Sequence, residues 1–270
     1  MTVTEPGPVR DDVRVADGTD IAVFVQGRGP ALVLVHGSIA DHTTFDPLVA
    51  ALRDDVTCYA MDRRGFGGTA DRPGYTIERD FDDVAAVVDE VAARTHGPVA
   101  LWGNSYGANC ALGAAALTRQ VGRLILYEPS LGLTYPPGSI EAVEAALARG
   151  DREGAITTVL MDALGMTEDE IAPFRENPLW PTRLAAAPTI PRECRAEQSW
   201  VYPPGRFDSI TAPTLFLTGS DSVPDITAAT RAAAAALPDA RIRILDGHGH
   251  FAHRNDPAMV AALVREFIGP

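Results

Sequence analysis

The residue that most strongly indicates chemistry is Ser105, in the stretch ALWGNSYGANCALG (residues 100–113). An apolar run ending in Trp102 precedes it, and a run of helical character follows it. The segment GNSYG (103–107) therefore matches G-x-S-x-G in the strand-to-helix context that marks a nucleophile elbow. The two glycines leave room for a sharp turn, which lifts the serine hydroxyl above the sheet. We predict that Ser105 is a nucleophile.

A serine hydroxyl is a weak nucleophile unless a neighbouring base takes its proton, and that base is normally a histidine held by a carboxylate. The stretch DGHGHF (246–251) lies between the last predicted strand and the final helix, and we predict that His250 is the base. The tract also resembles a metal-ligand set, but a motif of the H-x-H-x-D-H type requires Asp where Ala252 stands. We therefore interpret His248 and His253 as loop residues and expect no metal.

Short apolar runs of strand length are expected to form the sheet that positions these residues. They lie at 31–35, 56–61, 98–102, 124–127, 214–218 and 242–245. Helical patterns lie between most of them, at about 44–53, 80–95, 106–118, 226–236 and 257–268. Apolar runs that alternate with helices are typical of an α/β fold with a mostly parallel central sheet. A β-hairpin, with strands at 13–16 and 21–26, is expected to open the chain.

Between residues 129 and 209 the apolar strands vanish, and Ala-rich helical patterns alternate with Pro-rich breaks. Helices are predicted at 139–149, 152–164 and 167–176, whereas PLWPTRLAAAPTIP (178–191) is interpreted as irregular. We therefore expect an α/β core of residues 1–128 and 210–270, with residues 129–209 inserted as a helical cap or lid. The aromatic residues of this insertion either line an apolar substrate pocket or belong to the core of the cap; they are Tyr135, Phe174, Trp180, Trp200 and Tyr202.

Four landmarks, in order, resemble the α/β-hydrolase family. They are His36-Gly37, the DRRGFGGT segment (62–69), the elbow at Ser105 and the GHF segment (249–251). The resemblance covers nearly the whole chain and implies a mostly parallel sheet flanked by helices, with an inserted cap. It also implies that the backbone N–H groups of Ser38 and Tyr106 form an oxyanion hole. Such donors stabilise the transition state by a few kcal/mol each.

Two carboxylates are candidates to orient His250. The family usually places this acid after the strand predicted at 214–218, in a Gly-x-x-Asp pattern, but GSDS (219–222) puts Asp221 one position early. Glu128 instead ends the apolar run LILY at the carboxyl edge of the sheet, where some α/β hydrolases carry the acid. We favour Glu128 as the third member of the catalytic triad, with Asp221 as the alternative.

The amino-acid composition limits the classes of molecule that this chain is expected to bind. The formal net charge is −13, and the chain has no lysine and no basic run, which argues against nucleic-acid binding. Three scattered cysteines give neither a disulfide framework nor a metal cluster. The sequence shows no signal peptide and no apolar stretch of membrane-spanning length. We therefore expect a cytoplasmic protein that needs no cofactor, acts on a small molecule and binds no membrane; the sequence indicates no oligomeric state.

These residues predict a serine hydrolase, an esterase or lactonase, that cleaves a small or medium apolar carboxylic ester or lactone through an acyl-enzyme. The surroundings of Glu128, together with the positions of Trp180 and Pro191, are also similar to those in lactonases that open macrocyclic resorcylic lactones. Two alternatives remain open: non-ester chemistry on the same fold, by a C–C hydrolase, perhydrolase or cofactor-free lyase, and a ligand-binding, receptor-like module. Serine at position 105 argues against a haloalkane dehalogenase or an epoxide hydrolase, which would need a carboxylate there.

Overall fold

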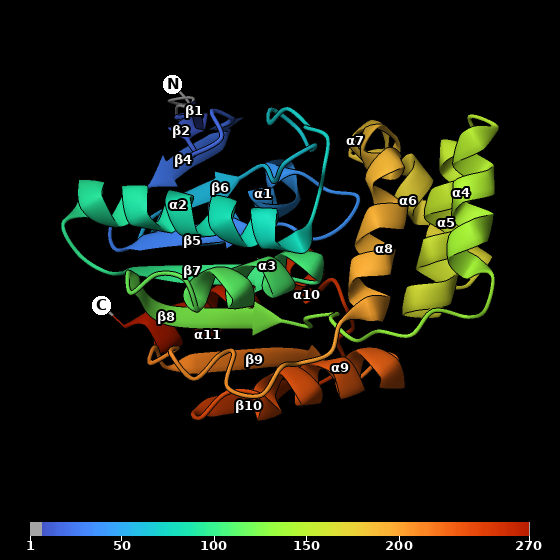
Figure 1. The fold of residues 1–270 in the computed structure, drawn as a ribbon. Helices are drawn as coiled ribbons and strands as arrows, with labels where there is room; N and C mark the ends of the chain where they lie inside the picture. Colours follow the sequence, from blue (N-terminus) through green and yellow to red (C-terminus); the bar gives the residue numbers. More distant parts are fainter. Residues whose placement is uncertain (1–6, 270) are drawn as a thin grey trace, which may run out of the picture.

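The central sheet is mostly parallel, as the apolar runs predict. A computed structural model describes residues 7–269, and its main sheet has eight strands in the order β1-β4-β6-β5-β7-β8-β9-β10 (Figure 1). Their bounds are β1 Val9–Arg10, β4 Val23–Gly27, β5 Ala31–Val35, β6 Thr57–Met61, β7 Val99–Asn104, β8 Val121–Tyr127, β9 Thr214–Gly219 and β10 Ala240–Leu245. β4 pairs antiparallel with β1 and β6, and the other strands pair in parallel.

The predicted opening hairpin is only half present. β2 (Val13–Arg14) and β3 (Asp20–Ile21) pair antiparallel as a separate two-stranded sheet, around the turn that contains Gly18. The second predicted strand is interrupted at Ala22, and its remainder forms β4 in the main sheet. The hairpin prediction was wrong in length because pairing with β6 competes for the second half of the run.

Helices cover both faces of the sheet. Their bounds outside the insertion are η1 His42–Phe45, α1 Asp46–Leu52, α2 Ile77–Thr95, α3 Tyr106–Ala115, α9 Pro224–Ala235, α10 Ala252–Asn255 and α11 Pro257–Ile268. Successive strand residues point to opposite faces, so Val33 and Val35 share a core with α2, α3 and α9, while Leu32 and Leu34 share one with α1 and α11. Burial on both faces explains why the strands are continuous apolar runs.

The insertion consists of helices that lie together at the end of the sheet toward which the parallel strands point (Figure 1). Their bounds are α4 Ser139–Ala148, α5 Arg152–Leu164, α6 Glu168–Glu176, α7 Trp180–Ala186, η2 Ala187–Thr189 and α8 Ile190–Ser199. They share a core of their own, which includes Val143 and Ile156 and also takes in Ile39 and Ile226 from outside the insertion. The division into core and cap at residues 129 and 209 stays a prediction.

The prediction that residues 178–191 are irregular was wrong, because α7, η2 and the start of α8 occupy them. Each of these helices has a proline in its first turn, at Pro181, Pro188 and Pro191. Proline breaks a helix interior but is tolerated in the first turn, where its missing N–H would have had no intrahelical partner. Helix α8 matters for the site because it carries the side chains of Glu193 and Glu197 toward the sheet.

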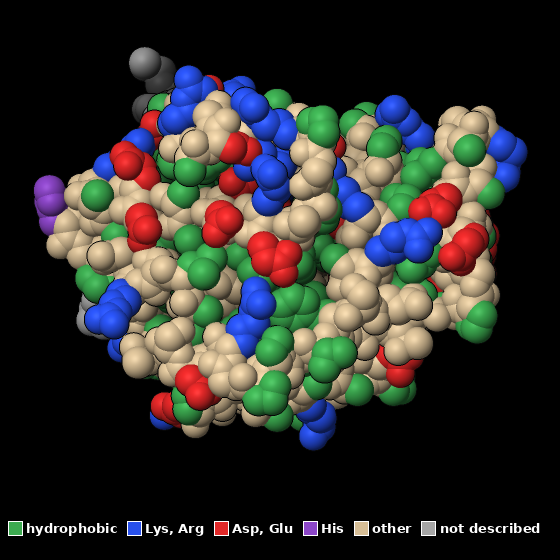
Figure 2. Space-filling view, in the orientation of Figure 1, with side chains coloured by type: hydrophobic (Ala, Val, Ile, Leu, Met, Phe, Trp, Pro, Cys, Tyr) green, Lys and Arg blue, Asp and Glu red, His purple; other side chains and the backbone are tan. Residues whose placement is uncertain are grey.

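Charged side chains of both signs are spread over the surface. On the face shown in Figure 2, acidic and arginine side chains alternate, and arginines gather over the end that carries β1 and β2. Among residues 7–269, no helix is both long enough and apolar enough to cross a membrane.

Candidate active site

Ser105 occupies the tight turn between β7 and α3. Its backbone has φ 54° and ψ −128°, a conformation that non-glycine residues adopt rarely and that is typical of functional turns. The Ser105 N–H donates to the Tyr127 carbonyl at 2.8 Å, which ties the turn to β8. A Cβ on Gly103 would lie 2.3 Å from the Gly107 oxygen, and a Cβ on Gly107 would lie 2.2 Å from the Val35 carbonyl oxygen. Both flanking positions therefore require glycine.

Glu128, the first residue after β8, faces His250. Its Oε2 lies 2.5 Å from His250 Nδ1, and its Oε1 accepts hydrogen bonds from the Gly219 N–H at 2.7 Å and from the hydroxyls of Thr218 and Ser222 at 3.1 and 2.5 Å. Burial alone would raise the pKa of this fully buried carboxyl, but the hydrogen bond and charge of His250, with the bonds from Ser222 and Gly219, lower it below the ordinary value. Glu128 therefore carries its negative charge next to the imidazole at neutral pH.

Asp221, the alternative acid, is exposed and lies outside this arrangement. Its carboxylate accepts a hydrogen bond from the neighbouring Ser220 hydroxyl, and its N–H donates to the His248 carbonyl at 3.0 Å. Among the hydrogen bonds and ion pairs of residues 7–269, none joins the Asp221 side chain to His250. The structure thus brings the histidine together with Glu128.

Ser105 and His250 line one cavity between the sheet and the insertion. It is walled by Gly37, Ser38, Ile39, Ala40, Thr44, Asn104, Ser130, Leu133, Tyr135, Val159, Leu160, Ala163, Leu164, Phe174, Arg183, Glu197, Ile226, Phe251, His253 and Arg254. Most of this wall is apolar, with a few polar and charged groups, which is usual for a small-molecule site.

Trp180 and Tyr202 do not line that cavity. The prediction that they line an apolar substrate pocket was therefore wrong. Trp180 packs in the core of the insertion. Tyr202 packs against the core beneath α2 and α3, with its ring edge-on to Trp200 and Phe207. Both aromatic rings serve packing, and the aromatic side chains that reach the cavity are Tyr135, Phe174 and Phe251.

Residues 32–263 match the Alpha/beta hydrolase family. The chain belongs to the alpha/beta hydrolase family. It is 27% identical over 261 residues to the 2-(acetamidomethylene)succinate hydrolase of Mesorhizobium japonicum, covering 90% of this chain and 89% of that protein. It is also 40% identical over 105 residues, 38% of each chain, to a pimeloyl-[acyl-carrier protein] methyl ester esterase of Xylella fastidiosa.

Solved structures agree with this family membership. The crystal structure of an alpha/beta hydrolase from Sphaerobacter thermophilus matches with a TM-score of 0.83 and 32% identity, over 96% of this chain and 100% of that one. The enol-lactonase from Burkholderia xenovorans matches with a TM-score of 0.73 and 21% identity, over 96% and 99% of the two chains, and so shares the fold. The curated relatives named above are hydrolases, and one of them is an esterase.

In this alpha/beta hydrolase, the two residues expected to supply oxyanion donors lie close to Ser105. Ser38 borders the cavity in the loop after β5, and Tyr106 is the first residue of α3. Because the first four N–H groups of a helix have no intrahelical acceptor, the Tyr106 N–H is available to an anion at the helix start. The Tyr106 ring is fully buried, and its hydroxyl shares a 2.6 Å hydrogen bond with the Tyr75 hydroxyl.

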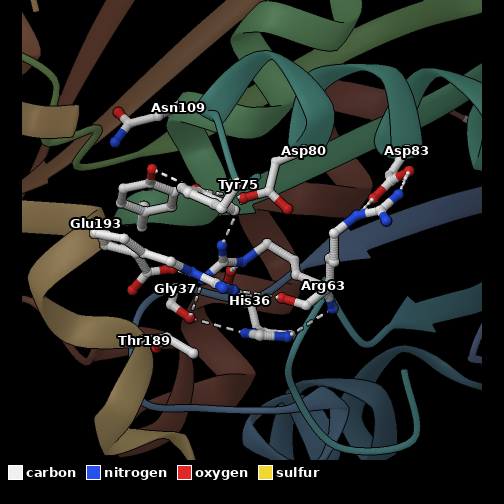
Figure 3. A network of polar contacts seen from close by, with 12 residues as sticks. His36, Gly37, Arg63, Tyr75, Asp80, Asp83, Asn109, Thr189 and Glu193 are labelled. Carbon is white, nitrogen blue, oxygen red and sulfur yellow. Dashed lines mark hydrogen bonds and ion pairs between the residues drawn. The ribbon is translucent and has the colours of Figure 1, made fainter. Parts of the chain in front are cut away.

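Arg63 holds the loop that leads to Ser38 through the backbone of His36 and Gly37 (Figure 3). Its Nε donates to the His36 carbonyl at 2.9 Å, and its Nη2 donates to the Gly37 carbonyl at 3.0 Å. The same guanidinium bonds to Asp80 on α2 at 3.1 Å and to Glu193 on α8 at 2.6 Å. Burial would lower the pKa of this fully buried group, but the charges of Glu193 and Asp80 raise it well above the ordinary value. One cation thus connects the loop at Ser38 with a helix of the insertion.

His36 is held as a neutral ring in the same network. Its Nε2 accepts from the Arg63 N–H at 3.0 Å, so its Nδ1 carries the proton and donates to the Gly37 carbonyl at 2.8 Å. Complete burial, together with the positive charge of Arg63, lowers its pKa to about 3. His36 therefore supports the loop and is not placed to act as a base.

Glu197 places a carboxyl group on the cavity wall, and no sequence motif marks this residue. Its oxygens accept hydrogen bonds from the Ser130 and Tyr135 hydroxyls. Complete burial is the main reason why its pKa is raised to about 7, an effect that the two hydrogen bonds only partly offset. Its role depends on helix α8, which places it near Ser130 and Tyr135, residues more than 60 positions away in the sequence.

The histidines of the GHGHFAH tract do not converge on a shared point. His248 Nδ1 lies 2.9 Å from the Asp246 carbonyl, while the His250 ring faces Glu128. His253 is buried with its ring near those of Phe45 and Tyr127, and burial lowers its pKa to about 3. This arrangement offers no common ligand position among the three.

Within residues 7–269, Asp41, His42 and Asp62 do have ligand atoms within 4.8 Å of one another. Asp62 Oδ1 accepts from the His42 N–H at 2.7 Å and faces His42 Nδ1 at 2.9 Å, while Asp41 caps η1 by accepting from the Thr43 N–H at 2.9 Å. These bonds connect the loops after β5 and β6, and they explain the cluster as a structural one.

Proposed function

We propose that the protein is a serine hydrolase that cleaves a carboxylic ester or lactone through an acyl-enzyme. The observation that carries this proposal is the glutamate–histidine pair at 2.5 Å, whose histidine lines the same cavity as a serine in a strained elbow. Hydrolysis of a methyl ester by one curated relative supports the ester class. The mostly apolar wall supports an acyl group of small or medium size.

In the proposed mechanism, Ser105 Oγ attacks the acyl carbon while His250 Nε2 takes its proton. Glu128 stabilises the imidazolium through the Nδ1–H bond and does not take the proton itself. The Ser38 and Tyr106 N–H groups bind the oxyanion, each contributing about 3 kcal/mol of transition-state stabilisation. His250 then protonates the leaving alcohol, water attacks the acyl-enzyme with His250 as base, and the acid product departs. The scheme uses only water and groups of this chain.

Paired amide substitutions test the proposed acid. Glu128→Gln keeps the shape of the side chain but removes its charge, so we expect kcat for p-nitrophenyl butyrate to fall by about 10³ to 10⁴. Asp221→Asn makes the same chemical change at an exposed carboxylate and should leave kcat within about twofold of wild type. A larger loss in Asp221→Asn would reverse the assignment. Turnover of a vinylogous diketone, with no ester turned over, would instead favour a C–C hydrolase.

A further inference from the structure

We propose that Arg183 and Arg254 form a subsite in the catalytic cavity for an anionic oxygen group of the substrate, a carboxylate or a phosphate. This inference rests on the proposed function, because it names the class of ester or lactone that Ser105 would attack. It narrows the substrate from an apolar acyl compound to one that carries a negative charge away from its reacting carbonyl.

Arg183 is a buried cation without an anionic partner. It lies on α7, is only 5% exposed and lines the cavity. Its Nη1 is buried and has no hydrogen-bond acceptor, and no carboxylate of residues 7–269 forms an ion pair with it. Its guanidinium lies over the Phe174 ring, whose centroid is 4.5 Å from Cζ. A ring face attracts a cation but leaves the N–H donors unused.

The other fully buried arginines of the described chain are paired. Arg63 binds Asp80 and Glu193, and Arg64 binds two carboxylates of its own. An uncompensated buried charge is strongly destabilising, and proteins normally place a counter-charge beside it. Arg183 departs from the pattern that this chain follows elsewhere. Arg183 lines the cavity, so an anion that enters the cavity would supply the missing partner.

Arg254 brings a second positive charge to the same cavity. It lies on α10, four residues after His250, is partly buried and also lines the cavity. Burial and then the charge of Arg254 lower the pKa of Arg183 to about 10, so Arg183 is a cation at neutral pH. Among residues 7–269, no ion pair joins either arginine to a carboxylate, and a bound anion would offset the repulsion between the two charges. Guanidinium groups bind carboxylate and phosphate oxygens in paired hydrogen bonds.

Aromatic rings separate this subsite from the reacting centre. The Phe251 ring is edge-on to His250 and to Phe174, with centroid separations of 5.2 Å in both cases, and Arg183 lies on Phe174. An anion at the arginines would therefore be joined to the ester carbonyl by a short apolar chain that passes these rings. Charges beyond about 8 Å are largely screened at physiological ionic strength, so the net charge of −13 does not prevent local binding.

Two matched esters test the proposal. The p-nitrophenyl half-ester of glutarate ends in a carboxylate, and p-nitrophenyl 5-methylhexanoate ends in an isopropyl group of similar shape. We expect the ratio of kcat/KM, glutarate over methylhexanoate, to fall about 10- to 100-fold in Arg183→Gln and in Arg254→Gln. The exposed Arg119, in the loop after α3, provides a charge-matched control, and Arg119→Gln should keep the wild-type ratio. An unchanged ratio in both cavity variants would overturn the proposal.

A binding measurement separates this proposal from the proposed function. Calorimetric titration of the Ser105→Ala protein with glutarate, inorganic phosphate and uncharged glutaramide needs no turnover. Binding of an anion that is lost in Ser105→Ala/Arg254→Gln supports the subsite even if neither ester is hydrolysed. Binding of glutarate but not of phosphate would identify a substrate with a carboxylate, and binding of phosphate but not of glutarate would identify a phosphorylated substrate. Binding of neither anion, or equal binding of glutaramide, would overturn the subsite, whatever the esterase assay shows.

Discussion

Replacement of Glu197 by glutamine should remove a pH-dependent loss of stability. The pKa of this carboxyl is raised from the reference value of 4.5 to about 7, mainly by burial. In the unfolded chain the group ionises near pH 4.5, whereas in the folded protein it stays protonated until about pH 7. The favourable contribution of this carboxyl to the free energy of unfolding is complete below pH 4.5 and is lost as the pH rises through 7. Since one pKa unit corresponds to 1.36 kcal/mol, the wild-type protein loses roughly 3 kcal/mol from this group.

Urea unfolding of wild type and Glu197→Gln at pH 5, 6, 7 and 8 measures this effect. Glutamine keeps the shape of the side chain but does not ionise, so the difference in unfolding free energy should shift by roughly 3 kcal/mol in favour of the variant between pH 5 and 8. Other titrating groups are common to both proteins and cancel in the difference. Glu176 is exposed, and Glu176→Gln should show no such shift. Parallel pH profiles for wild type and Glu197→Gln would refute the reasoning.

Three further changes test the scaffold of the site. Arg63→Met should lower the unfolding free energy by about 3 to 5 kcal/mol, because it leaves two buried carboxylates without their cation; a loss below 1 kcal/mol in urea unfolding would contradict this. Gly107→Ala should abolish ester hydrolysis or folding, because its Cβ would lie 2.2 Å from a backbone oxygen, and full activity would show that the elbow can relax. Ser222→Ala removes a 2.5 Å hydrogen bond to Glu128 and should raise the pKa of that carboxyl, so the acidic limb of the pH–rate profile should move to higher pH. An unchanged acidic limb would show that Ser222 does not lower the pKa of Glu128.

Features encoded in short segments could be predicted from the sequence. The elbow at Ser105 needs only a strand, two glycines and a helix in succession, and the parallel strands are apolar because both of their faces are covered. The position of Glu128 at the end of a buried strand was enough to favour it as a partner of His250, although 122 residues separate the two. The sheet brings these segments together, since parallel strands end at one edge.

Features that depend on packing between distant helices could not be predicted. Arg63 and Glu193 are 130 residues apart and meet only because α8 packs against the loop after β6. Arg183 lies in a Pro-rich stretch that resembles a loop until each proline is placed in a first helical turn. Whether the charge of Arg183 is paired depends on which carboxylates the fold brings near it, and the sequence around Arg183 does not predict those carboxylates.

Covalent labelling of the serine tests the central claim most directly. Wild type and His250→Ala are treated with a fluorophosphonate, and the modified peptide is identified by mass spectrometry. We predict rapid modification confined to Ser105 in the wild type and strongly slowed modification in His250→Ala, because the imidazole must take the serine proton. Labelling of Ser105 at the same rate in both proteins, or labelling of another residue in place of Ser105, would contradict the account.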